Sequence, residues 1–494
     1  MKKYIISIDQ GTTSTRAILI NAKGEEVFKA QRPVDCLFPE PGWVEADPMK
    51  IWVSVIDVVN EVLVVSSSTM DDIAGIGITD QRETTIVWDR KTGMPVYNAI
   101  IWQSKQTQSL CEERADKMEF IQERTGLRMN PYFSASKIRF ILDHIEDGQR
   151  RAERGELMFG TIDCWLIYKM TLGNHYTDVS NASRTMLYNI FKMEWDDELL
   201  KLWDIPRCML PEVLENSADF GEAKYFPGHV HITGVAGDQQ AALFGQCCFK
   251  EGDSKNTYGT GCFMLMNIGS KPFVSKKGLL TTVAWQENGV TTYALEGSVF
   301  MGGAIVQWLR DQMDMIKSSA QSEEYANRCK DTAGVYVVPA FVGLGTPYWD
   351  DDARGAVFGL TRGADRHNFV RATLFSIAYQ SKDVIETMKE EAGLNLKSLR
   401  VDGGASSNGL LMQFQSDILQ CEVHLPRFLE TSALGAGYLA GLGCGFWKSK
   451  KDIESNHSIQ KKYKPTMDKK EVAELYEGWK CAVAATRMFK PKKS

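Results

Sequence analysis

A strand–turn–strand pattern that occurs twice is the feature of this sequence that most restricts its fold. Residues 4–8 and 16–20 are apolar and indicate short strands, and the turn between them combines a glycine with four hydroxyl side chains. Residues 254–269 repeat this order around a Gly-Thr-Gly turn. Two such hairpins indicate a chain built from two similar halves, which repeat in pattern rather than in identity.

Strand and helix segments alternate along the rest of the chain. Strands are predicted at 73–79 and 84–88. One helix is predicted to begin after Asp47, a good N-cap, and another to cover 366–392 and stop at Gly393. Alternation of this kind is typical of an α/β protein.

The chain is long enough for two or three domains, since it has 494 residues. We place the lobe boundary near 245–253, and therefore expect an N-terminal domain over 1–248 and a C-terminal domain over 249–494. Small residues over 432–441 predict a helix that suits close packing of backbone against backbone.

Charge and cysteine content exclude several classes of protein. The 57 basic and 63 acidic side chains give a net charge of −6, which does not suit a protein that binds nucleic acid or anionic membranes. No apolar run reaches the roughly eighteen residues of a membrane span, so we expect no membrane insertion. The eleven cysteines are scattered without a Cys-x-x-Cys pair, which predicts a reducing, cytoplasmic location.

The first turn, over 9–15, is suited to phosphate. Its backbone N–H groups and hydroxyl donors lie in one concave segment, and Asp9 at its mouth has the chemistry to hold a divalent cation. The alternative is a threonine-rich hairpin that only satisfies its own backbone.

Two further glycine turns add to this interpretation. One is the second hairpin, over 257–261, and the other is 402–404, which follows a predicted strand and precedes a helix beginning near Asn408. Three such turns in two similar halves form the hypothesis of a nucleotide site between the halves. Neither a P-loop nor a Rossmann fingerprint is present.

Two polar clusters could bind a small acceptor. Adjacent Arg82 and Glu83 would exchange hydrogen bonds with vicinal hydroxyls, or else form an ordinary surface ion pair. Asp238 follows a predicted strand and would serve either as a catalytic base or as a helix cap. From the residues alone, we expect an ATP-like cleft between two lobes, with the chemistry left open.

Several blocks together resemble the FGGY carbohydrate kinases, and among them the members that phosphorylate glycerol. The similarity runs in order from about residue 4 to 447. The blocks are Asp-Gln-Gly-Thr-Thr-Ser-Thr-Arg (9–16), Pro-Gly-Trp-Val-Glu (41–45), Gln-Arg-Glu-Thr-Thr (81–85), Pro-Tyr-Phe-Ser (131–134), Asn-Ala-Ser-Arg-Thr (181–185), Ala-Gly-Asp-Gln-Gln (236–240), Asn-Thr-Tyr-Gly-Thr-Gly (256–261) and Asp-Gly-Gly (402–404).

The resemblance implies an α/β, actin-like ATPase fold with two ribonuclease-H-like lobes and a nucleotide cleft between them. It also implies roles for individual residues. ATP would contact Thr12, Thr13, Ser14 and Arg16 from the first lobe and Thr260, Gly303, Gln307, Gly404 and Asn408 from the second. Glycerol would contact Arg82, Glu83, Trp102, Tyr132, Asp238, Gln239 and Phe263. Asp238 would be the catalytic base, and Asp9 the carboxylate associated with Mg²⁺.

The implied reaction is ATP-dependent phosphorylation of glycerol to sn-glycerol 3-phosphate, in glycerol uptake and degradation. Two alternatives stay open: a kinase of the same family acting on another small polyol or ketose, and an actin-like ATPase with no small-molecule acceptor. The family also implies a homo-oligomer, either a dimer or a tetramer.

The segment 223–232 departs from two control devices found in glycerol-phosphorylating members of the family. One is a histidine in a Tyr-His-Phe context that the sugar phosphotransferase system phosphorylates, and the other is an arginine-containing loop that binds fructose bisphosphate. Here Phe226 follows Tyr225 directly, the loop has no arginine, and His229 and His231 come later. We therefore expect neither control to operate.

Overall fold

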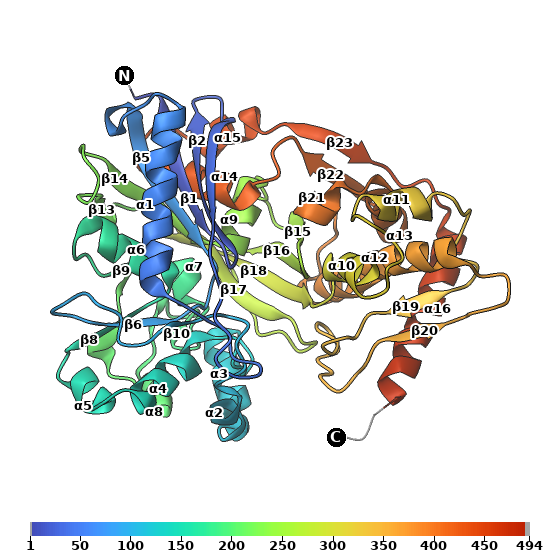
Figure 1. Ribbon diagram of the computed structural model, residues 1–494, viewed down its shortest axis with the longest axis horizontal. Helices are drawn as coiled ribbons and strands as arrows, with labels where there is room; N and C mark the ends of the chain where they lie inside the picture. The colour runs from blue at the N-terminus through green and yellow to red at the C-terminus, as the bar shows by residue number, and fades with distance from the viewer. Residues whose placement is uncertain (1, 490–494) are drawn as a thin grey trace.

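Two mixed β-sheets form the centre of the molecule, one in each half of the chain (Figure 1). The computed structural model describes residues 2–489. The first sheet has the order β13-β14-β5-β1-β2-β3 and the second β17-β18-β16-β15-β21-β22-β23. The strands of the first sheet are β1 (Tyr4–Gln10), β2 (Ser14–Asn21), β3 (Glu26–Pro33), β5 (Ile73–Asp80), β13 (Gly221–Glu222) and β14 (His231–Gly237). Those of the second are β15 (Ser254–Tyr258), β16 (Cys262–Gly269), β17 (Leu280–Glu287), β18 (Val290–Val299), β21 (Ser398–Asp402), β22 (Glu422–Pro426) and β23 (Ile459–Tyr463).

The two sheets have the same order of equivalent strands. In the first, β1 and β2 form an antiparallel hairpin, β1 runs parallel to β5, and β5 runs parallel to β14. In the second, β15 and β16 form the hairpin, and β21 and β22 continue the parallel part. Antiparallel strands close both edges, and β17 is an addition to the second sheet. The prediction of an α/β fold with two similar lobes is confirmed.

Local sequence signals explain the main helices. Asp47 caps α1 (Pro48–Val65), accepting a 2.8 Å hydrogen bond from the Met49 backbone N–H. The long helix α12 (Arg366–Ala392) ends at Gly393, whose φ of +64° favours glycine. Asn408 caps α13 (Gly409–Leu419). The first turn is shorter than predicted, because β1 extends to Gln10 and makes Asp9 a strand residue.

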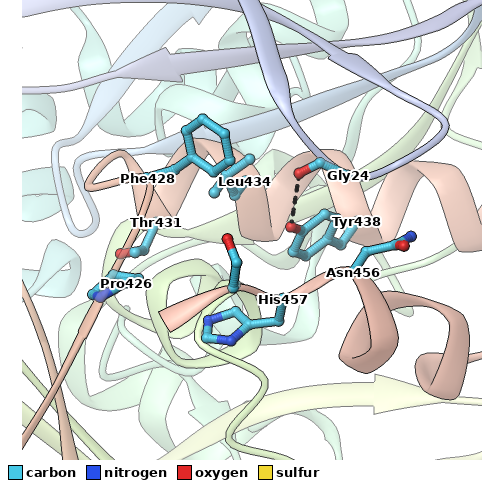
Figure 2. A pocket seen from close by; sticks show the side chains of 10 residues that line it. Gly24, Pro426, Phe428, Thr431, Leu434, Tyr438, Asn456 and His457 are labelled. Atoms are coloured by element: carbon cyan, nitrogen blue, oxygen red, sulfur yellow. Dashed lines mark hydrogen bonds between the residues drawn. The ribbon is translucent and has the colours of Figure 1, made fainter. Parts of the chain in front are cut away.

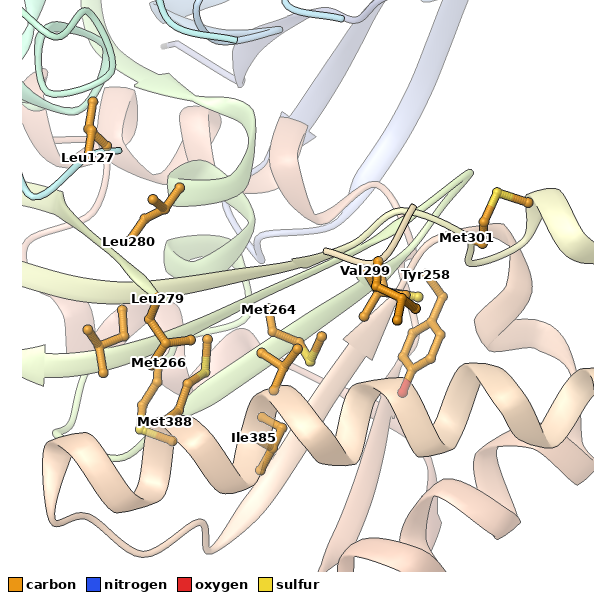
Figure 3. Close-up of a cluster of buried hydrophobic side chains, with 14 of the residues drawn as sticks. Leu127, Tyr258, Met264, Met266, Leu279, Leu280, Val299, Met301, Ile385 and Met388 are labelled. Atoms are coloured by element: carbon orange, nitrogen blue, oxygen red, sulfur yellow. The ribbon is translucent and has the colours of Figure 1, made fainter. Parts of the chain in front are cut away.

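A methionine-rich core fixes the second sheet on α12 (Figure 3). Met264 and Met266 extend from the sheet toward Ile385 and Met388 of α12, and all four are buried. Flexible thioether side chains fill the irregular space between a twisted sheet and a helix. This core holds the second hairpin in place.

Two helices with small residues connect the halves. Helix α9 (Asp238–Gly245) packs on α14 (Thr431–Gly443), and α14 also covers β1, β5 and β14. A Cβ added to Gly435 would overlap the carbonyl oxygen of Ala241, and one added to Gly245 would overlap that of Thr431. The predicted close backbone packing is therefore confirmed.

The predicted lobe boundary falls in the loop between α9 and β15. Because α14 of the C-terminal half covers the first sheet, the two halves are interlocked. The division into 1–248 and 249–494 stays a prediction. Within residues 2–489, no helix combines the length and the apolar character that a membrane span requires.

Candidate active site

Arg82 and Glu83 lie in the turn between β5 and β6 (Ile86–Asp89) and are both buried. The surface ion pair that the sequence left open is therefore wrong. Glu83 has a φ of +62°, which is unusual for a residue with a side chain and is found where surrounding contacts enforce it. The Lys137 ammonium supplies two such contacts, donating to the backbone oxygens of Glu83 (3.1 Å) and Tyr132 (2.7 Å).

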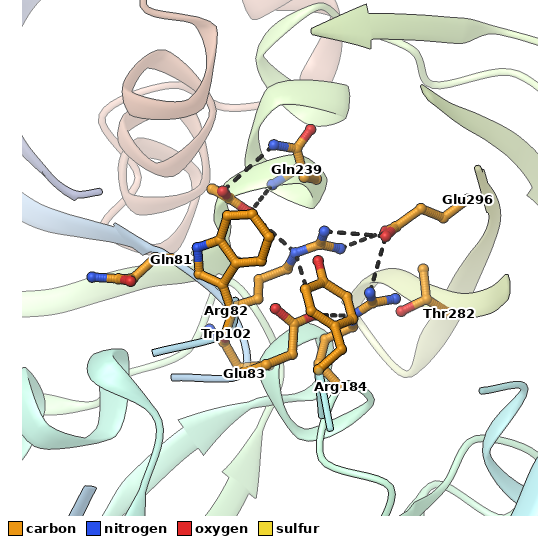
Figure 4. Close-up of polar contacts among 12 residues, drawn as sticks. Gln81, Arg82, Glu83, Trp102, Arg184, Gln239, Thr282 and Glu296 are labelled. Atoms are coloured by element: carbon orange, nitrogen blue, oxygen red, sulfur yellow. Dashed lines mark hydrogen bonds and ion pairs between the residues drawn. The ribbon is translucent and has the colours of Figure 1, made fainter. Parts of the chain in front are cut away.

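A buried cluster of charges surrounds these two residues (Figure 4). Arg82 donates to both carboxylate oxygens of Glu296, at 2.5 and 3.2 Å. Arg184 bridges Glu296 (2.9 Å) and Glu83 (2.6 Å). The Nε of Arg82 lies 3.1 Å from the Asp238 carboxylate. We call these five residues, Arg82, Glu83, Arg184, Asp238 and Glu296, the acceptor cluster.

Asp238 is the first residue of α9, but Gly237 occupies the N-cap position and the Asp238 side chain does not cap the helix. Its Oδ1 accepts from the Gln239 backbone N–H at 2.7 Å, and the side chain is 32% exposed, whereas that of Arg82 is 2% exposed. Asp238 therefore has a face open to a ligand, as a catalytic base requires.

Gln239 is buried beside it and binds a charged residue that the sequence did not single out. The Lys255 ammonium, on β15, donates to Gln239 Oε1 and to Thr257 Oγ1, the latter at 2.8 Å. Burial lowers the pKa of Lys255 to about 8, although the carboxylates of Asp402 and Asp238 partly oppose this. A cation from the C-terminal half thus reaches into the predicted acceptor site.

Three aromatic side chains form a wall next to the cluster. The Trp102 ring meets Tyr132 and Phe263 edge to face, with centroids 5.6 and 6.2 Å apart. The indole N–H of Trp102 donates to Thr12 Oγ1 at 2.9 Å. All three rings are only partly buried, so they line a site instead of belonging wholly to the core. The wall links the acceptor cluster to the first hairpin.

Two carboxylates share Arg16 beside the first hairpin, and Lys29 also pairs with one of them, Glu430, at 3.1 Å. The Arg16 Nη1 lies 3.2 Å from Asp9 and 3.0 Å from Glu430. Burial raises the pKa of Asp9 to about 6, Glu430 and Asp238 add to the rise, and Arg16 opposes it. A carboxylate with other carboxylates near it suits a cation that it holds together with water and phosphate oxygens. No cluster of three acidic, histidine or cysteine ligands occurs in the part of the chain that the structure describes.

The turns of the C-terminal half meet at the second hairpin. Gly303 donates its N–H to the carbonyl of Gly259 at 2.8 Å, just before α10 (Ala304–Asp311). A Cβ at Gly303 would lie 2.8 Å from that oxygen, so only glycine fits without a shift. Gly403, with φ +84°, packs on Tyr258 and brings the third turn alongside.

The remaining predicted nucleotide residues lie on or near these turns. Thr12, Thr13 and Ser14 follow Gly11 at the tip of the first hairpin, with Thr13 exposed. Thr260 and Gly404 are exposed, and Gln307 is exposed one turn along α10. Asn408 uses its carbonyl oxygen to cap α13, so only its amide group is available, and that amide donates weakly to Ser322 at 3.4 Å.

A separate crevice between α14 and the segment 456–458 is too small for a substrate (Figure 2). Its volume is about 10 Å³, near the minimum for a single water molecule.

Comparison with known proteins gives matches along nearly the whole chain. Residues 4–245 match the N-terminal domain and residues 254–444 the C-terminal domain of the FGGY family of carbohydrate kinases. A protein named glycerol kinase from Halalkalibacterium halodurans is 55% identical over 99% of this chain and 100% of its own length. One with the same name from Bacillus cereus is also 55% identical over 99% of this chain.

Solved structures agree with this assignment. Plasmodium falciparum glycerol kinase with ADP superposes with a TM-score of 0.92 at 37% identity and covers 98% of both chains. Gluconate kinase from Lactobacillus acidophilus reaches 0.89 at 21% identity over 99% of both chains, which supports the fold alone. The chain belongs to the FGGY family of carbohydrate kinases.

Proposed function

We propose that this chain transfers the γ-phosphoryl group of ATP to a terminal hydroxyl of glycerol, giving sn-glycerol 3-phosphate for glycerol uptake and degradation. The observation that carries the proposal is the placement of Arg82 beside Asp238, 3.1 Å apart, next to the aromatic wall. Relatives named glycerol kinase, 55% identical over their full length, support the choice of acceptor.

In this proposal the acceptor cluster binds hydroxyls and the wall packs against carbon. Arg82 donates to a hydroxyl, Glu83 and Asp238 accept, and Gln239 completes the set. Trp102, Tyr132 and Phe263 cover the carbon chain. A three-carbon triol offers little apolar area, so specificity comes from buried polar groups, which are costly to leave unpaired.

Asp238 then acts on the terminal hydroxyl. In phosphoryl transfer the transition state is loose, so orientation of the nucleophile matters more than strong basicity. Asp238 orients the hydroxyl oxygen toward the γ-phosphorus and takes its proton as the new P–O bond forms, while ADP leaves with the electron pair of the broken bond.

Nucleotide contacts come from both halves. Thr12, Thr13, Ser14 and Arg16 would bind phosphate oxygens from the first hairpin, and Thr260, Gly303, Gln307, Gly404 and Asn408 would bind the nucleotide from the second half. Asp9 would hold Mg²⁺, which when bound neutralises charge on the phosphates. Arg16 is paired with Asp9 and Glu430 before the nucleotide binds, and its guanidinium can then also donate to a phosphate oxygen.

A coupled assay of ADP release, with and without glycerol, tests the proposal. We expect turnover to depend on glycerol. Turnover that ignores glycerol but rises with another polyol or a ketose would replace it with the second candidate, a family kinase of different acceptor specificity. Turnover that ignores every acceptor would favour an ATPase.

Assembly and location follow from the resemblance and the cysteines. We propose a homo-oligomer, a dimer or tetramer, which light scattering after size exclusion tests. All eleven cysteines are free thiols, in keeping with a cytoplasmic location, which cell fractionation tests.

A further inference from the structure

We propose that Glu296 is a positioning residue for the acceptor site: from the second sheet, it fixes the guanidinium of Arg82 so that the Nε edge faces Asp238. The inference rests on the proposed function, because it concerns how the same site binds its acceptor. Glu296 acts through Arg82, which pairs with both Glu296 and Asp238.

Glu296 is the one charged residue of β18. It lies on β18 with none of its surface exposed, between Leu295 and Gly297. Glutamate is almost never buried completely unless it is paired. Burial opposes its ionisation, but Arg184 and Arg82 outweigh burial and lower the pKa of Glu296 to about 2. A permanent carboxylate is thus built into the second sheet.

The hydrogen bonds of Glu296 restrict Arg82 to one orientation. Glu296 accepts from both terminal nitrogens of Arg82, and Nη1 also donates to Gln240 Oε1 at 3.2 Å. A planar guanidinium held along one edge by a bidentate carboxylate cannot rotate about its own axis without breaking both bonds. The remaining Nε edge therefore has a fixed direction, toward Asp238.

Glu296 also keeps the second acceptor carboxylate available. Within the cluster, Arg82 and Arg184 are balanced by Glu83 and Glu296, and Arg184 already donates to both of them. Without the Glu296 charge, two buried guanidinium groups would compete for Glu83 and Asp238. Both carboxylates would then be less able to accept hydrogen bonds from an acceptor.

The strand that carries Glu296 is bonded to the second hairpin. Glu296 pairs in register with Leu265 of β16, and β16 begins directly after the turn that holds Thr260. The orientation of Arg82, in the N-terminal half, therefore depends on the sheet that carries the proposed nucleotide turn.

The test is Glu296→Gln, which keeps the size of the side chain and removes its charge. Steady-state kinetics should be measured with glycerol and ATP varied in turn, and again with propane-1,2-diol, an acceptor that lacks one hydroxyl. We expect KM for glycerol to rise about 10- to 100-fold, the range for a lost charged hydrogen bond, with KM for ATP within about twofold. The loss should be smaller for the diol, because fewer of its contacts depend on Arg82.

Asp383→Asn is the matched control. Asp383 is a buried carboxylate on α12 of the same half, and it accepts hydrogen bonds from Tyr348, Tyr476 and Trp479. This variant should lower the melting temperature and leave both KM values within about twofold of wild type. If Glu296→Gln does not fold, Glu296→Asp serves instead: it keeps the charge but shortens the reach, so KM for glycerol should again rise alone.

The two proposals fail in different ways. Wild-type protein without glycerol-dependent ADP release would overturn the proposed function. If wild type is active, three results for the Glu296 variant would overturn the positioning role alone. These are an unchanged KM for glycerol, a KM for ATP that rises as much as the KM for glycerol, and a KM for the diol that rises as much as the KM for glycerol.

Discussion

The two sheets share one strand order, but the ends of equivalent strands carry different residues. Strand β5 runs into Arg82 and Glu83, and its counterpart β21 runs into Gly403 and Gly404. The first sheet thus presents charged side chains, which suit the hydroxyls of a small acceptor. The second presents glycines, which let the backbone approach a larger ligand. One scaffold therefore supplies two kinds of recognition.

The two hairpins also differ in charge. Next to the first turn, Asp9 pairs with Arg16, whereas the equivalent pair in the second hairpin is Thr257 and Phe263. The first hairpin is a charged site that suits a cation and phosphates. The second offers a hydroxyl on one strand and part of the aromatic wall on the other.

The largest effect is expected at Asp238, the side chain on which the acceptor half depends most. Asp238→Asn keeps the size of the side chain but removes the proton acceptor, so kcat should fall by about 10²- to 10⁴-fold. Nucleotide affinity, measured by calorimetry, should stay near that of wild type. A folded variant with wild-type turnover would show that Asp238 is not the base.

Replacing Asp9 should show how much the burial of its charge lowers the free energy of unfolding. Its pKa is about 6 in the folded protein and about 3.8 in a model peptide, so the folded state binds more protons between these values. Stability should therefore fall as pH rises from about 4 to 6, and Asp9→Asn should be more stable than wild type at pH 7.5 by up to about 3 kcal/mol.

Urea unfolding at pH 4 and 7.5 checks this prediction, and the difference between the two proteins should shrink to below about 1 kcal/mol at the lower pH. The same variant should lose activity. An Asp9→Asn protein that is less stable than wild type at pH 7.5 would show that the Arg16 contact outweighs burial.

Glu83→Gln tests whether the charged residues at the end of β5 serve the acceptor and not the nucleotide. Loss of one buried acceptor charge should weaken glycerol binding by about 1–3 kcal/mol, with a smaller effect on ATP. Separate titrations with each ligand measure this. Equal losses for both ligands would place Glu83 outside the acceptor site.

Thr260→Val is the corresponding test of the C-terminal half. It removes one exposed hydroxyl and keeps the shape, so ATP binding should weaken by about 0.5–1.5 kcal/mol while glycerol binding is unchanged. The reverse pattern, with glycerol alone affected, would contradict the assignment of the second hairpin turn to the nucleotide.

The smallest effect on activity is expected from treatments that target the two histidines near the edge of the first sheet. His229, in the loop before β14, lies 2.6 Å from Glu222, and His231, the first residue of β14, lies 2.8 Å from Asp219. Incubation with the phosphocarrier system, and separately with fructose bisphosphate, should leave activity unchanged. Phosphate on either histidine with activation, or inhibition by the bisphosphate, would contradict this.

Features set by neighbouring residues could be predicted from the sequence. The Asp47 and Asn408 caps, the end of α12 at Gly393 and the repeated hairpins all depend on local patterns. The charges that complete the acceptor cluster could not be found in this way, because Glu296 meets Arg82 across 214 positions of sequence. The available signal was that Glu296 is the one charged residue of β18, whereas Lys255 stands among polar residues of β15 and gave no comparable signal.

The backbone contact between α9 and α14 limits how the two halves can move. Helices usually slide past each other by small changes in the side chains between them, but Gly245 and Gly435 leave no such layer at this crossing. Helix α14 packs just as closely on the first sheet, where Gly77 and Gly234 meet its backbone, so α9 and α14 are expected to move together with that sheet. Asp238 begins α9 about one turn from the contact with Gly435, so the base would stay fixed on the first sheet while the second hairpin moves relative to it.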